Sequence, residues 1–96
     1  MVIGVLQVEL LIGESVSLKD KRRVILGLKE RLHRDHSVAV AEVDRHDAHQ
    51  IAVLGIVNVS NSVPHTQSVL DKIVNQLRQG RDYVLNNQQQ EILSGR

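Results

Sequence analysis

The order of strand-like and helix-like segments restricts the fold of this chain more than any other feature. Residues 2–12 alternate well enough for a strand, with Leu6, Val8 and Leu10 on one face. Residues 18–34 carry apolar side chains at helical spacing, which predicts an amphipathic helix. The first two elements are therefore a strand and a helix, joined by the short loop GESVS.

The second half of the chain repeats these signals in a different order. Two β-branched runs, residues 37–44 and 50–60, flank a short polar connection and predict a hairpin. A second helix pattern closes on Gly80, and a polar strand pattern at 83–93 follows, broken by the tract NNQQQ. The predicted order is thus β-α-β-β-α-β.

Helix starts are marked by capping residues. Ser17 and Asp20 have the spacing of a capping box, in which each side chain satisfies the other residue's backbone N–H. Asn61 or Ser62 caps the second helix, and Pro64 stands in its first turn. Capping and turn chemistry accounts for these polar residues without a ligand.

This order predicts an α+β, ferredoxin-like βαββαβ sandwich: a four-stranded antiparallel sheet with two helices on one face. Strands one and three are expected at its centre. We expect one domain over residues 1–96, since a chain of 96 residues supports one core. Residues 81–96 form either the final edge strand or a tail. Tyr83 is the only aromatic residue, so the core is aliphatic.

Two helices cover only one face of such a sheet, and the other face is predicted to be apolar. Placing the polar strand residues Gln7, Glu9, Glu42 and Asn58 outward brings aliphatic neighbours with them. Those neighbours are Ile3, Val5, Leu11, Val38, Val40, Leu54 and Ile56. Monomers rarely expose such a patch, so we expect a homodimer through the open sheet face. A one-residue slip in one strand would invert its faces.

The stretch SLKDKRR places cations where a helix begins, although the helix dipole favours acids there. Residues 18–34 carry a net charge of +5 within a chain of net charge +1. We interpret this helix as an anion-binding surface in which Lys19, Arg22 and Arg23 contact phosphates, assisted by Lys21 and Arg34. Lys21 points toward the sheet and must extend along its aliphatic stem to reach solvent. The alternative is a solvated helix face or a subunit contact.

The shortage of aromatic residues restricts the kind of nucleic acid contact. A sheet that stacks bases, as in RNA-recognition motifs, needs aromatic side chains that this chain lacks. What remains is recognition of backbone and shape, which suits structured RNA, for instance on the ribosome. The alternative is a protein–protein interaction module that docks an acidic partner on the same helix.

Metal binding and catalysis receive weaker support. Asp44, His46, Asp47 and His49 offer nitrogen and oxygen ligands, but all four lie in one short connection, so we predict no metal site and no cofactor.

Acylphosphatases share this fold class and need an arginine in the loop after the first strand. GESVS has none, and Asn58 alone does not replace it, so we predict a protein without catalytic activity.

Localisation follows from composition. The chain has no cysteine, which suits a reducing cytoplasm. Its apolar start lacks a basic n-region, contains Gln7 and Glu9, and is too short to span a bilayer. We therefore expect a cytoplasmic protein without membrane attachment.

The segments SLKDKRR, VAVAEVD and GIVNVSN together resemble the YlxP-like family of small bacterial proteins, over Met1 to about Leu77. The resemblance implies a ferredoxin-like fold. It also implies a role near the ribosome, since genes of the family often lie among those for translation initiation and ribosome maturation, and it brings no established enzymatic activity. Family members often carry an aromatic residue between strands two and three, where this chain has Ala48 and His49.

Overall fold

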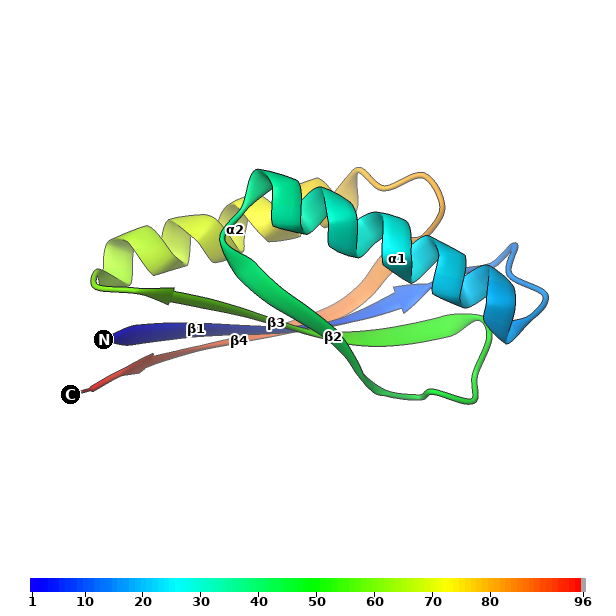
Figure 1. Ribbon diagram of the computed structural model, residues 1–96, viewed down its shortest axis with the longest axis horizontal. Coiled ribbons are helices and arrows are strands. Elements are labelled where there is room, and N and C mark those ends of the chain that lie inside the picture. The colour runs from blue at the N-terminus through cyan, green and yellow to red at the C-terminus, as the bar shows by residue number, and fades with distance from the viewer. Residues whose placement is uncertain (96) are drawn as a thin grey trace.

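The computed structural model describes residues 1–95 and contains four strands and two helices (Figure 1). The elements in chain order are β1 (Val2–Leu11), α1 (Leu18–Asp35), β2 (Val38–Asp44), β3 (Ile51–Ser60), α2 (Val63–Arg78) and β4 (Val84–Ser94). The order predicted from the sequence is confirmed, and the main boundaries agree within one or two residues.

The four strands form one antiparallel sheet in the order β2-β3-β1-β4. Strands β1 and β3 are central, as predicted, and pair over ten residues from Val2 opposite Ser60 to Leu11 opposite Ile51. Both helices cover the same face of the sheet and run in opposite directions (Figure 1). The fold is the ferredoxin-like α+β arrangement expected from the sequence.

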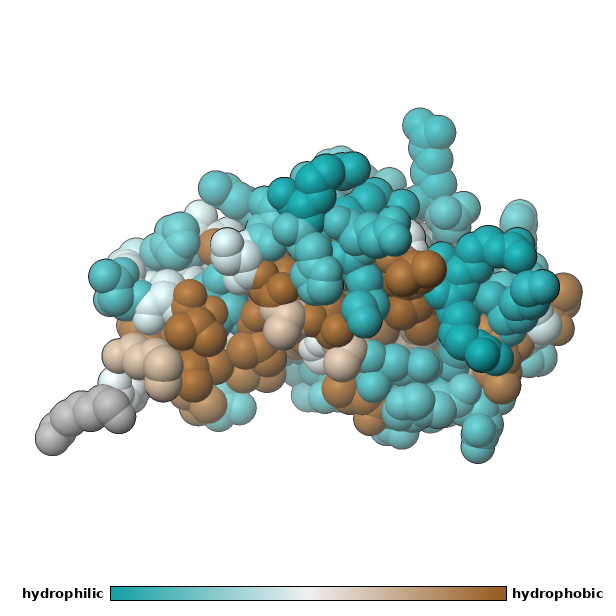
Figure 2. Space-filling view, in the orientation of Figure 1, coloured by the Kyte–Doolittle hydropathy of each residue, from teal (hydrophilic) through white to brown (hydrophobic). Residues whose placement is uncertain are grey.

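The core lies between the helices and the covered face of the sheet. From β1 it takes the alternate residues Leu6, Val8 and Leu10, each at most 1% exposed. The helices add Ile25, Leu28, Leu32, Leu70, Ile73 and Leu77. Figure 2 shows hydrophilic side chains over α1 and hydrophobic ones gathered below it, toward the sheet. Burial of these aliphatic side chains, at about 25 cal/mol per Å², is the main force that holds the layers together.

The predicted faces of β2 and β3 are wrong, although that of β1 is right. Pairing places Leu54 opposite Val8 and Asn58 opposite Gly4, on the helix-covered face. The residues of β2 and β3 that were expected outward but face the helices are Val38, Val40, Glu42, Leu54, Ile56 and Asn58. Because β3 is apolar at both odd and even positions, periodicity alone does not assign its faces.

The open face that results is apolar on β3 and polar on β4. Val57 and Val59 lie outward beside Val5 and Ile3 of β1, and Val59 is 59% exposed. Toward β4 the same face carries Gln7, Glu9, Asn87, Gln89 and Glu91. The homodimer expected through this face stays a prediction, with a different set of residues from that inferred by periodicity.

The end of the described chain is an edge strand rather than a tail. β4 continues through the tract NNQQQ instead of breaking there, and pairs with β1 from Leu11–Val84 to Val2–Ser94. A register shift at Glu9/Leu10 leaves Asn86 as an extra residue in β4, so the strand has a bulge at that point. Of the predicted segment 81–96, residue 96 lies outside the described residues.

Candidate functional site

The N-terminus of α1 is built by the two capping residues that the sequence indicates. Ser17 is the N-cap, and its Oγ accepts the N–H of Asp20 at 3.1 Å. The carboxylate of Asp20 accepts the N–H of Val16 at 3.0 Å, one residue before the N-cap. The reciprocal bond of the predicted capping box is therefore shifted by one residue. These bonds hold the first turn of α1 in place.

Lys21 does not belong to the exposed surface of α1, so its expected part in anion binding is wrong. It is 1% exposed, and its Nζ donates to Glu42 Oε2 at 2.7 Å and to the carbonyl of Arg45 at 3.0 Å. Two further carbonyls, of His46 and Ile51, lie at 3.3 Å. An ammonium group with four oxygen partners inside the protein has no donor left for a phosphate.

The position of Lys21 in the sequence explains its burial. Leu18, Lys21, Ile25, Leu28 and Leu32 are spaced by three and four residues, so Lys21 falls on the apolar side of α1. Its partner Glu42 was expected outward and lies instead on the covered face of β2. The spacing in the sequence thus indicated that Lys21 is buried. The identity of its partner could not be predicted, because it depends on the pairing of β2 with β3.

Lys19, Arg22 and Arg23 form the exposed cationic turn of α1. All three side chains are exposed, and Arg22 Nε donates only to the carbonyl of Leu18, at 3.4 Å. Among residues 1–95 the ion pairs are Lys21–Glu42 and Arg34–Asp35, so these three cations have no acidic partner. A cluster of unpaired cations in the first turn, where the helix dipole is also positive, attracts anions.

Arg34 lies at the far end of α1 and is paired. Its Nε is 3.1 Å from Asp35 Oδ1, and this hydrogen bond lowers the pKa of the Asp35 carboxyl below its ordinary value. Gln76 of α2 donates to the same carboxylate at 3.1 Å and contacts His36 Nε2 at 2.8 Å. The structure therefore ties Arg34 to the junction of the two helices and places it about 22 Å along the axis from Lys19.

Charge is divided between the two layers of the molecule. The four strands contain no lysine or arginine but carry Glu9, Glu42, Asp44 and Glu91. Helix α1 alone carries seven lysines and arginines against three acids. Because Glu42 is paired with Lys21, the unpaired acids of the strands are Glu9, Asp44 and Glu91, and the excess positive charge lies on α1. Such an uneven distribution orients charged partners at a distance.

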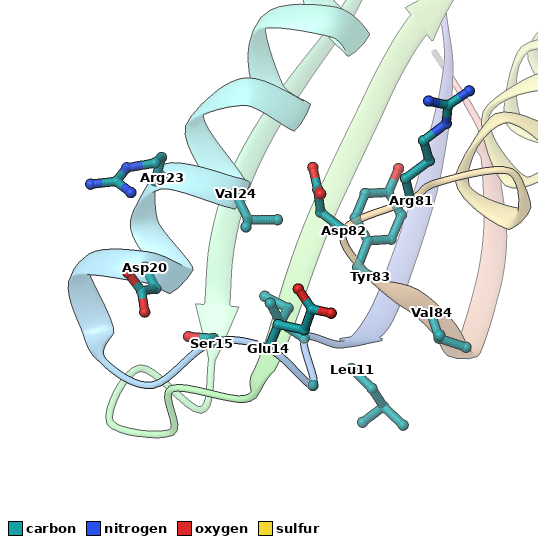
Figure 3. A pocket seen from close by; sticks show the side chains of 12 residues that line it. Leu11, Glu14, Ser15, Asp20, Arg23, Val24, Arg81, Asp82, Tyr83 and Val84 are labelled. Atoms are coloured by element: carbon teal, nitrogen blue, oxygen red, sulfur yellow. The ribbon is translucent and has the colours of Figure 1, made fainter.

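A cleft of about 440 Å³ lies beside the cationic turn, at the end of the sheet. Figure 3 shows it between the first turns of α1, the loop that follows β1 and the loop that precedes β4. Its lining contains three acids, Glu14, Asp20 and Asp82, and Figure 3 shows the Arg23 side chain directed away from Tyr83 and Asp82. The lining also contains Arg81, so the cleft has mixed charge, and its three acids outnumber its two arginines, Arg23 and Arg81. This balance does not favour a phosphate in the cleft.

Tyr83 forms part of this cleft and is 6% exposed. Burial raises the pKa of its phenol above the ordinary value, while the nearby Arg31 guanidinium opposes this shift. The backbone of Gly80 lies against the ring so closely that a Cβ at that position would overlap it. Tyr83 is therefore a packing residue and is not displayed for stacking on a base.

The end of β2 and the connection between β2 and β3 contain the four weak metal candidates. Asp44, His46, Asp47 and His49 are exposed, and Asp44 Oδ1 accepts the N–H of Arg45 at 2.7 Å. Over residues 1–95, no three histidine, cysteine or acidic side chains converge as metal ligands would. The connection is shaped instead by the positive φ of Arg45, 55°, and by the carbonyls that bind Lys21.

A buried polar cluster that the sequence did not indicate joins β3 to α2. Thr66, which is fully buried, lies 2.6 Å from Ser60 Oγ and donates to Asn58 Oδ1 at 3.2 Å. Asn58 Nδ2 in turn donates to the carbonyl of Ser37 at 2.9 Å. The side chain of Asn58 is therefore fully used in packing and is not displayed at an open site.

One further finding concerns membrane spans, and two concern similarity to known proteins. Within the described chain, no helix is both long enough and apolar enough to cross a membrane. No curated protein matches the sequence. A family model described as "Protein of unknown function (DUF503)" does match, over residues 3–90. That match covers most of the chain, including all six secondary-structure elements in whole or in part. The chain therefore belongs to this family of proteins of unknown function, DUF503.

Proposed function

We propose that this protein binds structured RNA in the cytoplasm through the cationic turn of α1, without catalytic activity. The observation that carries the proposal is that Lys19, Arg22 and Arg23 are exposed and unpaired in one helical turn. Cations in a first turn cost about 0.3–1 kcal/mol each at low ionic strength. Binding of an anionic partner explains why three cations lie at the positive end of the helix dipole.

The expected contacts are between side chains and phosphates. Two N–H groups at the helix start already donate to Asp20 and Ser17, so the guanidinium and ammonium groups supply the donors. Arg22 and Arg23 are suited to bidentate contacts with phosphate oxygens, and Lys19 acts as a point charge. Arg34 assists only with RNA helices that are long enough to span the distance of about 22 Å from Lys19. Asp35 also competes with phosphates for the guanidinium of Arg34.

Such binding reads backbone and shape rather than bases. The one aromatic ring, that of Tyr83, is buried, so no stacking platform is available within the described residues. The resemblance to the YlxP-like family supports ribosomal RNA as the source of the structured RNA, since it implies a role near the ribosome. We propose that the YlxP-like resemblance and the DUF503 family describe the same group of proteins.

The test is a salt titration of binding to a structured ribosomal RNA fragment and to purified small ribosomal subunits. Three phosphate contacts predict a slope of about −2.7 in log K against log salt, or roughly a 40-fold loss of affinity between 50 and 200 mM. Arg23→Glu is expected to weaken binding by at least about tenfold at low salt, because it loses one contact and adds repulsion. Circular dichroism melting shows whether the variant is folded.

Lys72→Glu is the matched control, since Lys72 is exposed on α2 and the change in net charge is the same. It is expected to leave binding nearly unchanged. Equal effects of the two variants would mean that only overall charge matters, and the cationic turn would not be the site. Absence of binding by the wild type at low salt would refute RNA binding.

A protein partner is a second candidate because of one apolar residue. Leu26 is 58% exposed on α1, although it lies near Arg22 and Arg23 along the helix. An acidic protein with a small apolar contact would use all three residues, whereas a phosphate backbone would not use Leu26. Leu26→Ser therefore separates the two candidates: it is expected to weaken a protein complex and to leave RNA affinity unchanged.

A further inference from the structure

Strand β4 is a long sheet edge with few protective features. It spans eleven residues at one end of the sheet order, whereas the average strand has five or six. Figure 1 shows it on the side of the sheet opposite β2. We propose that two copies of this chain pair β4 with β4, antiparallel about a two-fold axis at Gln89, to form a continuous eight-stranded sheet.

The composition of β4 is the first argument. Soluble proteins protect exposed edges with lysine, proline, charged residues or bulges, whereas VLNNQQQEILS has no lysine, arginine or proline, one acid, and a single bulge at Asn86. The N–H of Gln88 donates to the side chain of its neighbour Asn87 at 2.9 Å. A local side-chain acceptor occupies this amide, so Gln88 is not committed to a ladder bond with β1. We take this amide as part of the row that faces the open edge.

The second argument is that β4 is complementary to itself in one register. With Gln89 opposite its own copy, Gln88 faces Gln90 and Asn87 faces Glu91. Asn86 is the bulge residue, so the next pairs are Leu85 with Ile92 and Val84 with Leu93. Leu85 and Ile92 are both half-buried and contact the core, while Val84 and Leu93 are 64% and 46% exposed. Every pair therefore joins side chains of like character on the same face of the sheet.

Charge selects the same register. An amide opposite a carboxylate, as in the pair of Asn87 and Glu91, forms a favourable cross-strand contact. Moving the axis two residues toward the C-terminus places Glu91 opposite Glu91, and like charges directly opposite are destabilising. Moving it two residues the other way places Gln89 opposite an apolar residue at the start of β4 and loses the amide–carboxylate pair. The pair at Gln89 itself is uncharged, so nothing in the favoured register repels the second copy.

The open sheet face is a poorer dimer surface than this edge. A face-to-face contact centred on β1 buries Glu9 and Glu91, and the strands contain no lysine or arginine to pair with them. A buried carboxylate without a cationic partner is costly, and the Asn86 amide that donates to Glu9 does not neutralise its charge. Pairing at the β4 edge leaves both carboxylates at the solvent-facing surface, where they stay hydrated.

Engineered disulfides test the register directly, because the chain has no cysteine of its own. Gln89→Cys places two thiols across the axis in a non-hydrogen-bonded pair, with Cα atoms about 4.5 Å apart, within disulfide range. Asn87→Cys is the matched control, since its copy lies about four residues away along the partner strand, roughly 14 Å. With oxidised glutathione, we expect the dimer band of Gln89→Cys to exceed that of Asn87→Cys by about tenfold or more.

Light scattering of charge variants provides an independent measurement on the full chain. Gln89→Lys sets two ammonium groups face to face and is expected to shift the mass from two copies toward one, whereas Asn87→Lys meets Glu91 and keeps the dimer. Val59→Glu lies on the open face of β3 and is expected to leave this dimer intact. A wild type that stays monomeric at millimolar concentration, equal cross-linking of the two cysteine variants, or a dimer broken by Val59→Glu alone would overturn the proposal.

Discussion

The ammonium group of Lys21 lies 2.7 Å from the carboxylate of Glu42, at a site where the lysine is 1% exposed. This contact joins α1 to β2, and three carbonyls of the connection between β2 and β3 complete the shell around Nζ. A cation at the start of α1 therefore has a structural role that its neighbours in the same turn do not share. The two roles are separable by mutation.

Lys21→Met is expected to destabilise the fold by about 3 kcal/mol, since it leaves a partly buried carboxylate and three carbonyls without their donor. Chemical denaturation gives the free energy of unfolding. Lys19→Met, a change of the same kind at an exposed position, is expected to alter it by less than about 0.5 kcal/mol. Equal effects of the two substitutions would show that the buried contact contributes no stability.

Gly4→Ala is expected to destabilise the protein by about 1–3 kcal/mol, because its Cβ would overlap Thr66 Cγ2 of α2. Thr66→Ser removes that methyl group and keeps the hydroxyl that binds Asn58. The double variant is therefore expected to be more stable than the sum of the single changes predicts, a coupling that a double-mutant cycle measures. If the effects of the two changes on the free energy of unfolding were additive, the contact with Thr66 would not be the source of the strain in Gly4→Ala.

Ionisation of the buried Tyr83 phenol is expected to lower the stability of the fold at alkaline pH. Burial raises the pKa of its phenol above the unfolded value of 10.0, so the folded protein holds this proton more tightly than the unfolded chain. The stability contribution is fully present below pH 10.0 and is lost as pH rises through the folded pKa. Tyr83→Phe removes this dependence, so the melting temperatures of variant and wild type should converge or cross above pH 10.0. Parallel curves throughout would contradict the assignment.

Ser17→Ala removes the N-cap of α1 and is expected to cost about 1 kcal/mol, because the N–H of Asp20 loses its acceptor. Ser68→Ala is a useful contrast, since Ser68 lies exposed inside α2 where alanine is the better helix former. It is expected to raise stability by a few tenths of a kcal/mol. If both substitutions were neutral in thermal melts, the cap would not contribute.

The sequence predicted much of the fold because its signals are local. Apolar spacing identifies α1, and Ser17 and Ser62 mark the starts of both helices at the positions that the structure shows. The order of six elements then leaves few topologies. The faces of β3 were not predictable in this way, because apolar residues occupy both its odd and its even positions, as Val53, Leu54, Ile56 and Val57 show.

The cationic turn was likewise visible in the sequence, since charge needs no structure to be counted. Which cations are free depends on contacts at two levels, one between neighbours in the chain and one between distant segments. Lys21 is buried in an ion pair because the pairing of β2 with β3 turns Glu42 toward the helices. Arg34 is paired because Asp35 is the next residue in the chain. Local periodicity determines the elements of this protein, but the partners of its charges depend on strand register, which forms only when distant segments pair.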